Sequence, residues 1–407
     1  PAIFPAGSTR ENPMPRPSFD RRDLLGAAGA AMIAPLLADV RPRPAPLQSR
    51  WSDAIIINTL GSITNPNQPR VGTAVADTVA PRDRIRRSID ARALREARES
   101  GLTAINTTLL PVVDGGDPFV ATMANLAAMD GFIREHSDQL LKVYGAGDIE
   151  RAKRERKVGI IYGTQNTIML GDDARRIDLV ADLGIRVVQL TYNVRNRVGD
   201  GALAPDDQGL TPFGHEVVER LNANRVIVDL GHSGRKICLD AARVSKQPIA
   251  ITHTGCRALA DLPRNKSDEE LRAVASKGGY VGIYFMSVFL TPTGVAGAAD
   301  VIAHIEHAIK VCGEDHVGVG TDGSVTGVDD VEAYREAIAR DVAGRRAAGV
   351  SAPGESSGGL TFVPELSGPT QFYELADLLV QRGHPVSRVE KVLGLNFHRF
   401  AREVWGA

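Results

Sequence analysis

From residue 51 onward, short apolar runs rich in β-branched residues alternate with longer segments whose apolar residues recur at helical spacing. This alternation predicts strands separated by helices. The predicted strands are 54–58, 102–108, 158–162, 186–191, 225–230, 248–252, 280–285 and 316–321, and 141–144 is a weaker candidate. Predicted helices include 118–136, 173–183, 214–223, 268–276 and 300–312, followed by 371–381, 388–393 and 396–404.

The near-continuous apolar character of these strands is typical of a parallel sheet with helices on both faces. Eight strand–helix units predict an α/β fold, a (β/α)8 TIM-type barrel over residues 51–407 with additional C-terminal helices. A doubly wound open sheet is the alternative, but no G-x-G-x-x-G or G-x-x-x-x-G-K-[ST] phosphate loop follows a predicted strand. The Gly- and Ser-rich stretch 352–359 is predicted to be a loop or a lid.

The charge balance narrows the range of possible functions. The 407 residues include 48 Lys and Arg against 49 Asp and Glu, which argues against a nucleic-acid partner, since such proteins usually carry a basic face. No run of eighteen or more apolar residues predicts a spanning helix. The three cysteines, Cys238, Cys256 and Cys312, are too few and too scattered for a disulfide scaffold or a zinc ribbon, so we interpret them as buried free thiols.

The first fifty residues differ from the rest in composition. Arg21 and Arg22, followed by two leucines and the Ala- and Gly-rich run 26–38, match the plan of a twin-arginine export signal. The Pro-rich stretch 41–50 predicts a linker. We therefore expect residues 1–50 to be a signal peptide and linker, handled by the twin-arginine export machinery, and the protein to be periplasmic or otherwise exported. The alternative is a tail with a chance Arg-Arg pair.

Ionisable residues stand at the ends of three predicted strands. His232 follows the fifth strand, His253 the sixth and Asp322 the eighth. In a barrel these positions face the active site. Two histidines and a carboxylate, with one position open to water, form a common catalytic metal arrangement in which the carboxylate can accept the proton of the water. The alternative is that both histidines are structural hydrogen-bonding groups.

The remaining histidines and Cys256 have less specific settings. Cys256 lies three residues beyond His253 and could be a thiolate ligand or a nucleophile, but a metal-free buried thiol is the favoured interpretation. His398, in the last predicted helix, is interpreted as structural. Surface positions are expected for His136, His215, His304, His307, His316 and His384.

Eight short motifs, taken in order, resemble those of the renal-type membrane dipeptidases. They are Thr-Tyr-Asn at 191–193, Gln-Gly-Leu-Thr-Pro-Phe-Gly at 208–214, Val-Ile-Val-Asp-Leu-Gly-His-Ser at 226–233, Ile-Thr-His at 251–253, Arg-Asn at 264–265, Gly-Gly at 278–279, Val-Gly-Val-Gly-Thr-Asp at 317–322 and Leu-Gly-Leu-Asn at 393–396. The resemblance extends from residue 51 to the C-terminus. It implies a metal-dependent barrel of the amidohydrolase type that holds two zinc ions, cleaves dipeptides, often tolerates a D-residue at their C-terminal side, and often forms a homodimer.

The resemblance also implies roles for four residues. His232 and His253 correspond to ligands of one zinc ion, and Asp322 corresponds to the residue that handles the proton of the attacking water. Arg264 corresponds to the group that holds the substrate carboxylate, a role that suits its planar, two-pronged guanidinium.

Three positions depart from the family pattern. Where family members have a His-x-Asp pair for the other zinc ion, Leu60 and Ser62 stand here. The bridging Glu of the family corresponds to Gln165, whose neutral amide is a poor bridge between two cations. The substrate-facing His corresponds to Tyr192, whose hydroxyl can still donate a hydrogen bond to a developing oxyanion.

Counting ligands predicts one zinc ion rather than two, held by His232 and His253 with Gln165 or Asp322 as a third partner. Three hypotheses follow. The chain is an exported hydrolase of a dipeptide or related small amide, a divergent member that tailors another periplasmic metabolite, or a protein that binds a small peptide-like ligand without chemistry.

Overall fold

The computed structural model describes residues 50–68, 79–110, 116–355 and 359–406. The predicted signal peptide lies outside these residues, so the domain boundary near residue 50 stays a prediction. Within the described residues, eight strands follow one another as neighbours in a single sheet. They are β1 (Ile56–Asn58), β2 (Leu102–Thr108), β4 (Val158–Thr164), β5 (Ile185–Gln189), β6 (Ile227–Asp229), β7 (Ala250–Thr254), β8 (Tyr280–Ile283) and β9 (Val317–Val319).

The sheet curls into a nearly closed barrel. Every pairing between neighbouring strands is parallel. At the seam, the backbone N–H of Thr59 donates to the carbonyl of Val319 at 3.0 Å, and Ser62 forms a parallel bridge with Ser324. These contacts bring the first strand against the last, and the predicted (β/α)8 barrel is confirmed. The weaker candidate at 141–144 is real: β3 (Leu140–Val143) pairs with β4 beside the barrel.

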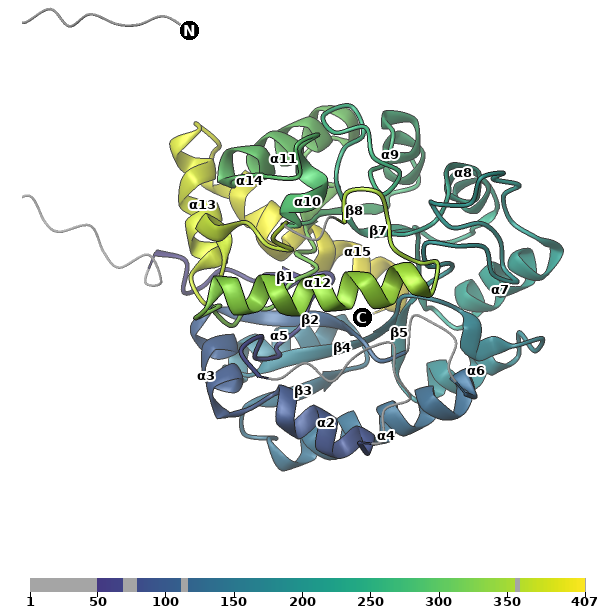
Figure 1. Cartoon of the computed structure of the whole chain (residues 1–407), viewed down its shortest axis with the longest axis horizontal. Coiled ribbons are helices and arrows are strands. Elements are labelled where there is room, and N and C mark those ends of the chain that lie inside the picture. The colour runs from purple at the N-terminus through teal and green to yellow at the C-terminus, as the bar shows by residue number, and fades with distance from the viewer. Residues whose placement is uncertain (1–49, 69–78, 111–115, 356–358, 407) are drawn as a thin grey trace, which may run out of the picture. The chain divides into compact units, whose positions relative to one another are not determined.

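Helices surround the barrel (Figure 1). Helix α4 begins after Asp117, whose carboxylate accepts from the N–H groups of Phe119 and Val120 and so caps the helix. The helices of the first half are α2 (Pro81–Ser88), α3 (Ala91–Glu99), α4 (Pro118–Glu135), α5 (Ala146–Glu155), α6 (Arg176–Asp182), α7 (Pro212–Ala223) and α8 (Arg235–Val244). Those of the second half are α9 (Asp268–Ala275), α10 (Ser287–Leu290), α11 (Ala298–Cys312), α12 (Val331–Ala347), α13 (Gln371–Gln381), α14 (Val386–Glu390) and α15 (Asn396–Trp405).

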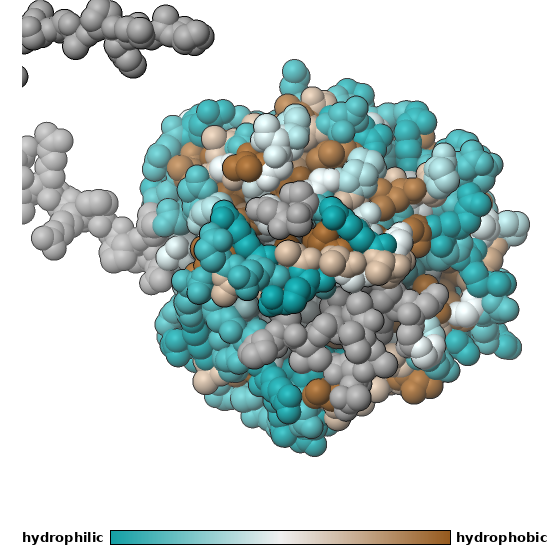
Figure 2. Space-filling view, viewed as in Figure 1, coloured by the Kyte–Doolittle hydropathy of each residue, from teal (hydrophilic) through white to brown (hydrophobic). Residues whose placement is uncertain are grey.

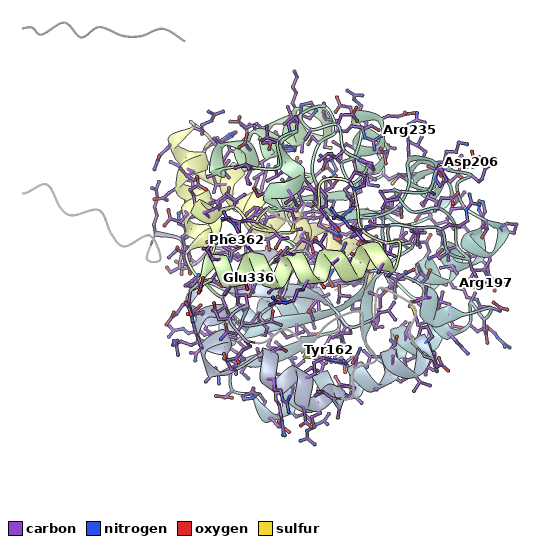
Figure 3. All side chains as sticks on the ribbon, in the orientation of Figure 1. Tyr162, Arg197, Asp206, Arg235, Glu336 and Phe362 are labelled. Carbon is purple, nitrogen blue, oxygen red and sulfur yellow. The ribbon has the colours of Figure 1, made fainter. Side chains whose placement is uncertain are left out.

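Helix α12 lies across the face of the barrel that Figure 1 presents. Its buried residues, Tyr334, Ile338 and Val342, form a small apolar cluster that Phe362 joins. Figure 3 labels Glu336 on this helix and Phe362 beside it. The surface on this side is largely hydrophilic, with hydrophobic side chains scattered over it (Figure 2). None of the described helices combines the length and apolar character needed to cross a bilayer.

The barrel interior changes from apolar to polar along the strands. Side chains of a strand alternate between its two faces, so residues two positions apart point the same way. Near the strand starts, five such residues pack in one cluster with Phe397 and Phe400 of α15: Ile57, Ala104, Ile161, Val187 and Ile227. Two positions further along stand Thr59, Asn106, Gly163, Gln189 and Asp229. The polar end of the barrel is therefore the end where the strands finish.

Candidate active site

Two buried histidines meet at the polar end of the barrel. His253 lies on β7 and His232 three residues beyond β6, and their ring centres are 4.9 Å apart. Nδ1 of His232 lies 2.5 Å from Oδ1 of Asn193, which can only accept, so this nitrogen carries the proton. Nδ1 of His253 lies 3.0 Å from the hydroxyl of Thr252, which itself donates to Asp229 at 2.7 Å. Both imidazoles therefore present an unprotonated Nε2.

Burial keeps these imidazoles neutral. It lowers the pKa of His232 and of His253 well below the usual value, and the positive charge of Arg264 lowers both further. Neutral imidazole with a free Nε2, and with Nδ1 bonded to an oxygen, is the form in which histidine binds metal ions. The pair is thus arranged as metal ligands are, with the two Nε2 atoms on the same side as Gln165.

Gln165 stands between the two imidazoles. It follows β4 by one residue, and its Nε2 lies 3.4 Å from Nε2 of His232 and 3.4 Å from Nε2 of His253. The amide oxygen accepts from the hydroxyl of Thr108 at 3.0 Å. Because Thr108 can equally accept a hydrogen bond, turning the amide over would direct its oxygen at the same point. The structure therefore brings together the three residues predicted as metal ligands.

The donor set around the two imidazoles is small and neutral. Among the residues that the structure describes, no group of three or more His, Cys, Asp and Glu side chains could hold a metal ion. Asp322 therefore does not complete a His-His-carboxylate set with His232 and His253, because its carboxylate does not lie within ligand reach of both. Two neutral imidazoles and the Gln165 amide remain, a set without the negative charge that strengthens most catalytic sites.

The segment after β1, where the sequence predicts that two metal ligands are missing, is closed by hydrogen bonds. Leu60 is buried, and its carbonyl accepts from the N–H of Asp322 at 2.9 Å. The N–H of Ser62 donates to the carbonyl of Gly323 at 2.9 Å, and its hydroxyl pairs with that of Thr64 at 2.8 Å. These side chains offer one hydroxyl and no imidazole or carboxylate.

Asp322 is a buried carboxyl group beyond the end of β9. It lies three residues beyond β9 with φ +56°, in the left-handed region, where an Asp is tolerated better than most residues. Burial raises its pKa to about 6, although Arg264 and Arg345 act in the opposite direction. A carboxyl group that titrates near neutrality is suited to accept a proton during catalysis.

Arg264 is a buried cation with an unused donor. Its side chain is 1% exposed, and its Nη1 donates to the carbonyl of Gly231. Its Nη2 has no hydrogen-bond partner among the described residues. Leaving such a donor unpaired is costly, and a substrate carboxylate would satisfy it.

Tyr192 covers His232. It lies three residues beyond β5, is buried, and its ring is stacked on the imidazole with centres 4.1 Å apart and planes 24° apart. Burial raises the pKa of its hydroxyl, so the phenol stays protonated and able to donate. The guanidinium of Arg345 lies 5.7 Å from the centre of the same ring. Arg345 comes from α12, which holds none of the family motifs, so no sequence signal pointed to it.

One histidine prediction is wrong. His304 is 1% exposed rather than at the surface. Its Nδ1 accepts from the N–H of Cys256 at 2.8 Å, and its Nε2 lies 2.9 Å from the carbonyl of Leu290, so the ring joins the loop after β7 to α10. An amphipathic helix pattern did not separate this buried position from its exposed neighbours.

The cysteine interpretation holds for Cys238 and Cys256, which are free and fully buried, whereas Cys312 is free but only partly buried. The thiol of Cys256 faces the carbonyl of His304 at 3.4 Å. Burial raises its pKa, which opposes a role as thiolate ligand or nucleophile.

The fold and the site together are those of a hydrolase-like parallel barrel, with histidines and a carboxylate at its strand ends and a buried arginine acting on the histidines. The family described as "Membrane dipeptidase (Peptidase family M19)" matches residues 92–342. The chain belongs to this family, whose dipeptidases are metal-dependent.

Individual relatives agree. A solved amidohydrolase from Pseudomonas aeruginosa is 30% identical, with 89% of this chain and 99% of that chain covered and a TM-score of 0.72. Dipeptidase tcpJ from Claviceps purpurea is 27% identical over 70% of this chain and 60% of its own length. A metallopeptidase from Rhodobacter sphaeroides, solved with a phosphinate mimic of L-Ala-D-Ala, is 19% identical and covers 86% of this chain and all of its own, with a TM-score of 0.67; it shares the fold.

Proposed function

We propose that this chain hydrolyses a dipeptide or a related small amide with the help of one metal ion, zinc in the first instance. The observation that carries the proposal is the convergence of two unprotonated imidazole nitrogens, those of His232 and His253, on the amide of Gln165. Family membership supports the reaction class, and the absence of a third ionisable ligand among the described residues supports a single ion.

Arg264 would bind the carboxylate of the substrate. Its free Nη2 offers a charge-assisted hydrogen bond in a buried place. The same guanidinium acts electrostatically on Tyr192 and on Asp322, so a small substrate held there would lie close to both groups. This arrangement favours substrates with a free carboxylate near the bond to be cleaved.

The side chains around that substrate have complementary roles. A zinc ion held by His232, His253 and Gln165 would supply Lewis-acid polarisation of the amide. Asp322 would accept the proton of the attacking water, and the protonated hydroxyl of Tyr192 would donate to the developing oxyanion.

A dipeptide panel tests this proposal. L-Ala-D-Ala belongs in the panel because the Rhodobacter sphaeroides relative was solved with a mimic of it. With zinc supplied, the wild type should turn over at least one member, and Arg264→Met should raise KM about tenfold or more for substrates with a free carboxylate. Arg272→Met is the matched control, since Arg272 is exposed and paired with Asp268 on α9. Absence of turnover across the panel would overturn the proposal.

A second candidate is a divergent enzyme or a binding protein for a peptide-like ligand. The observation that favours it is the neutral donor set, in which Gln165 offers an amide and Leu60 no ligand at all. Retention of a dipeptide or its phosphinate mimic without turnover, lost in Arg264→Met, would establish this reading.

We also propose that the mature protein acts after export. The support is the pair Arg21 and Arg22 ahead of an apolar run. Replacing both arginines by lysine should leave the protein in the cytoplasmic fraction, whereas replacing Arg10 alone, upstream of the pair, should not. Unchanged fractionation of the paired variant would remove this proposal and leave the hydrolase proposal intact.

A further inference from the structure

Residues 345–355, which comprise the last turn of α12 and the loop after it and are called the turn 345–355 here, reach the candidate active site at two points. The first is Arg345, in the last helical turn, whose guanidinium lies 5.7 Å from the centre of the Tyr192 ring. That ring is itself stacked on His232 at 4.1 Å. A guanidinium over an aromatic face is attractive, and more so when both groups are shielded from water. Arg345 therefore restricts the ring that covers His232.

The second point is the carbonyl of Val350. It accepts from Nδ2 of Asn193 at 2.7 Å, while Oδ1 of the same amide lies 2.5 Å from Nδ1 of His232. Fixing the amide nitrogen on the turn forces the amide oxygen to face the imidazole. An oxygen there requires the proton of His232 to sit on Nδ1, which leaves Nε2 free on the side of the site.

The turn is held in shape by Glu355. One carboxylate oxygen accepts from Nη2 of Arg345 at 2.5 Å, and the other accepts from the hydroxyl of Ser351 at 2.8 Å. Its backbone carbonyl accepts from Arg346 at 3.0 Å. The side chains of Arg345 and Glu355 are only 21% and 8% exposed. Because both carboxylate oxygens are engaged, the guanidinium has a fixed orientation above Tyr192.

We propose that the turn 345–355 is a positioning element of the active site. Arg345 holds Tyr192 and the Val350 carbonyl holds Asn193, and these two neighbours fix the ring orientation and tautomer of His232. Arg345 and Asn193 are thus positioning residues, which act through His232 and Tyr192. Their importance for turnover rests on the proposed hydrolase function, but the effect on His232 does not.

The experiment observes the imidazole of His232 directly in the full chain. Histidine labelled with 15N distinguishes the two neutral tautomers by the chemical shifts of the ring nitrogens, and Arg345→Met removes the guanidinium while keeping a long side chain. The His232 signals, assigned by their loss in His232→Gln, should move in Arg345→Met and show the Nε2-protonated tautomer in Asn193→Ala. Those of His304 should stay in place. Arg340→Met, on the exposed face of α12, is the matched control and should move none of them.

Metal binding gives the second readout. Cobalt(II), whose visible spectrum reports its ligands, should bind about tenfold more weakly to Asn193→Ala and Arg345→Met than to Arg340→Met, the size of effect expected for partners of a ligand. Arg345→Lys, which keeps the charge but not the planar fork, should lie between. It also replaces Arg345→Met if that variant does not fold.

The outcomes separate the two proposals. Unchanged His232 signals in both Arg345 variants would overturn the positioning role, whatever the activity of the enzyme. Shifted His232 signals in a protein that hydrolyses no dipeptide would support the positioning role and overturn the proposed function. Equal cobalt affinity in Asn193→Ala and the control would overturn the claim that the turn prepares His232 for a metal ion.

Discussion

The two halves of the barrel mouth are built alike but carry different chemistry. On the side of β1, β2, β4 and β5, the strand ends present neutral groups: Leu60, Ser62, Thr108, Gln165 and Gln189. On the side of β6, β7 and β9 they present ionisable ones: Asp229, His232, His253 and Asp322. Both sides follow the same alternation along parallel strands. The backbone thus provides equivalent positions around the ring. The identity of a few side chains confines the charged groups of the proposed chemistry to one side, while Gln165 and Tyr192 contribute neutral groups from the other.

The contrast between the two halves would fail first if the ionisable side chains were not needed for zinc binding and turnover. His253→Ala removes one of the two nitrogen donors, so bound zinc should be lost and turnover should fall more than about hundredfold, exceeding the effects of changes behind a ligand. Metal analysis of the purified protein together with dipeptide turnover checks this. His215→Ala, an exposed histidine on α7, should retain both. A full complement of metal in His253→Ala would mean that the ion binds elsewhere.

Asp322 gives the next largest effect. Asp322→Asn should lower turnover by about 10²-fold or more, since a general base is removed. In the wild type, turnover should rise with pH through about 6 as Asp322 loses its proton, and this step should vanish in the variant. A pH–rate profile of both proteins decides the matter; a step near pH 6 that persists in Asp322→Asn belongs to another group.

Burial of the Asp322 carboxyl group should lower the stability of the folded protein at neutral pH. Its pKa of about 6 in the folded protein lies above the value of about 3.9 in an unfolded chain, so the folded state binds the proton more tightly. Stability should therefore fall as pH rises from about 4 to 6 on account of this group, and Asp322→Asn should be more resistant to urea than the wild type at pH 7. Equal midpoints at pH 7 would contradict the strained burial of Asp322.

The contrast between the two halves can be tested further by placing a charge in the neutral half. Gln165→Glu places a carboxylate between His232 and His253, and carboxylates are better ligands than amides, so zinc affinity should increase about tenfold or more. Competition with a metal chelator measures the change. Gln208→Glu, in the loop before α7, serves as the control for added charge. Unchanged affinity in Gln165→Glu would show that this side chain does not approach the ion.

The smallest effect is expected at Cys256. Its thiol is buried against the carbonyl of His304 and takes no part in the proposed reaction. Cys256→Ala should leave turnover within about twofold while lowering the free energy of unfolding by about 1–2 kcal/mol through lost packing. Denaturant unfolding and dipeptide turnover measure both quantities. A large loss of turnover in a stably folded variant would bring the nucleophile interpretation back.

Part of the site could be read from the sequence because it depends on position along a strand. His232, His253 and Asp322 follow apolar runs, and parallel strands bring such ends to one side of a sheet. Arg345 could not be found this way. It stands among several arginines of a helix with mixed polarity, and the pattern of α12 contains nothing that separates a guanidinium over Tyr192 from one in solvent. The prediction of a surface position for His304 failed for the same reason, because the helical pattern does not separate a buried imidazole from an exposed one.

The sequence by itself determined the barrel, the family and the residue types at the strand ends, because these follow from local alternation and from short motifs. It also predicted that Leu60 and Ser62 stand where family members have stronger ligands. Only the tertiary structure decided that Gln165 meets both imidazoles and that Asp322 stays out of their ligand set. It also decided that the carbonyl of Val350, 157 residues beyond Asn193, holds the amide that faces His232. These relations depend on contacts of a few ångströms between side chains that lie far apart in the sequence. No local sequence pattern encodes such contacts.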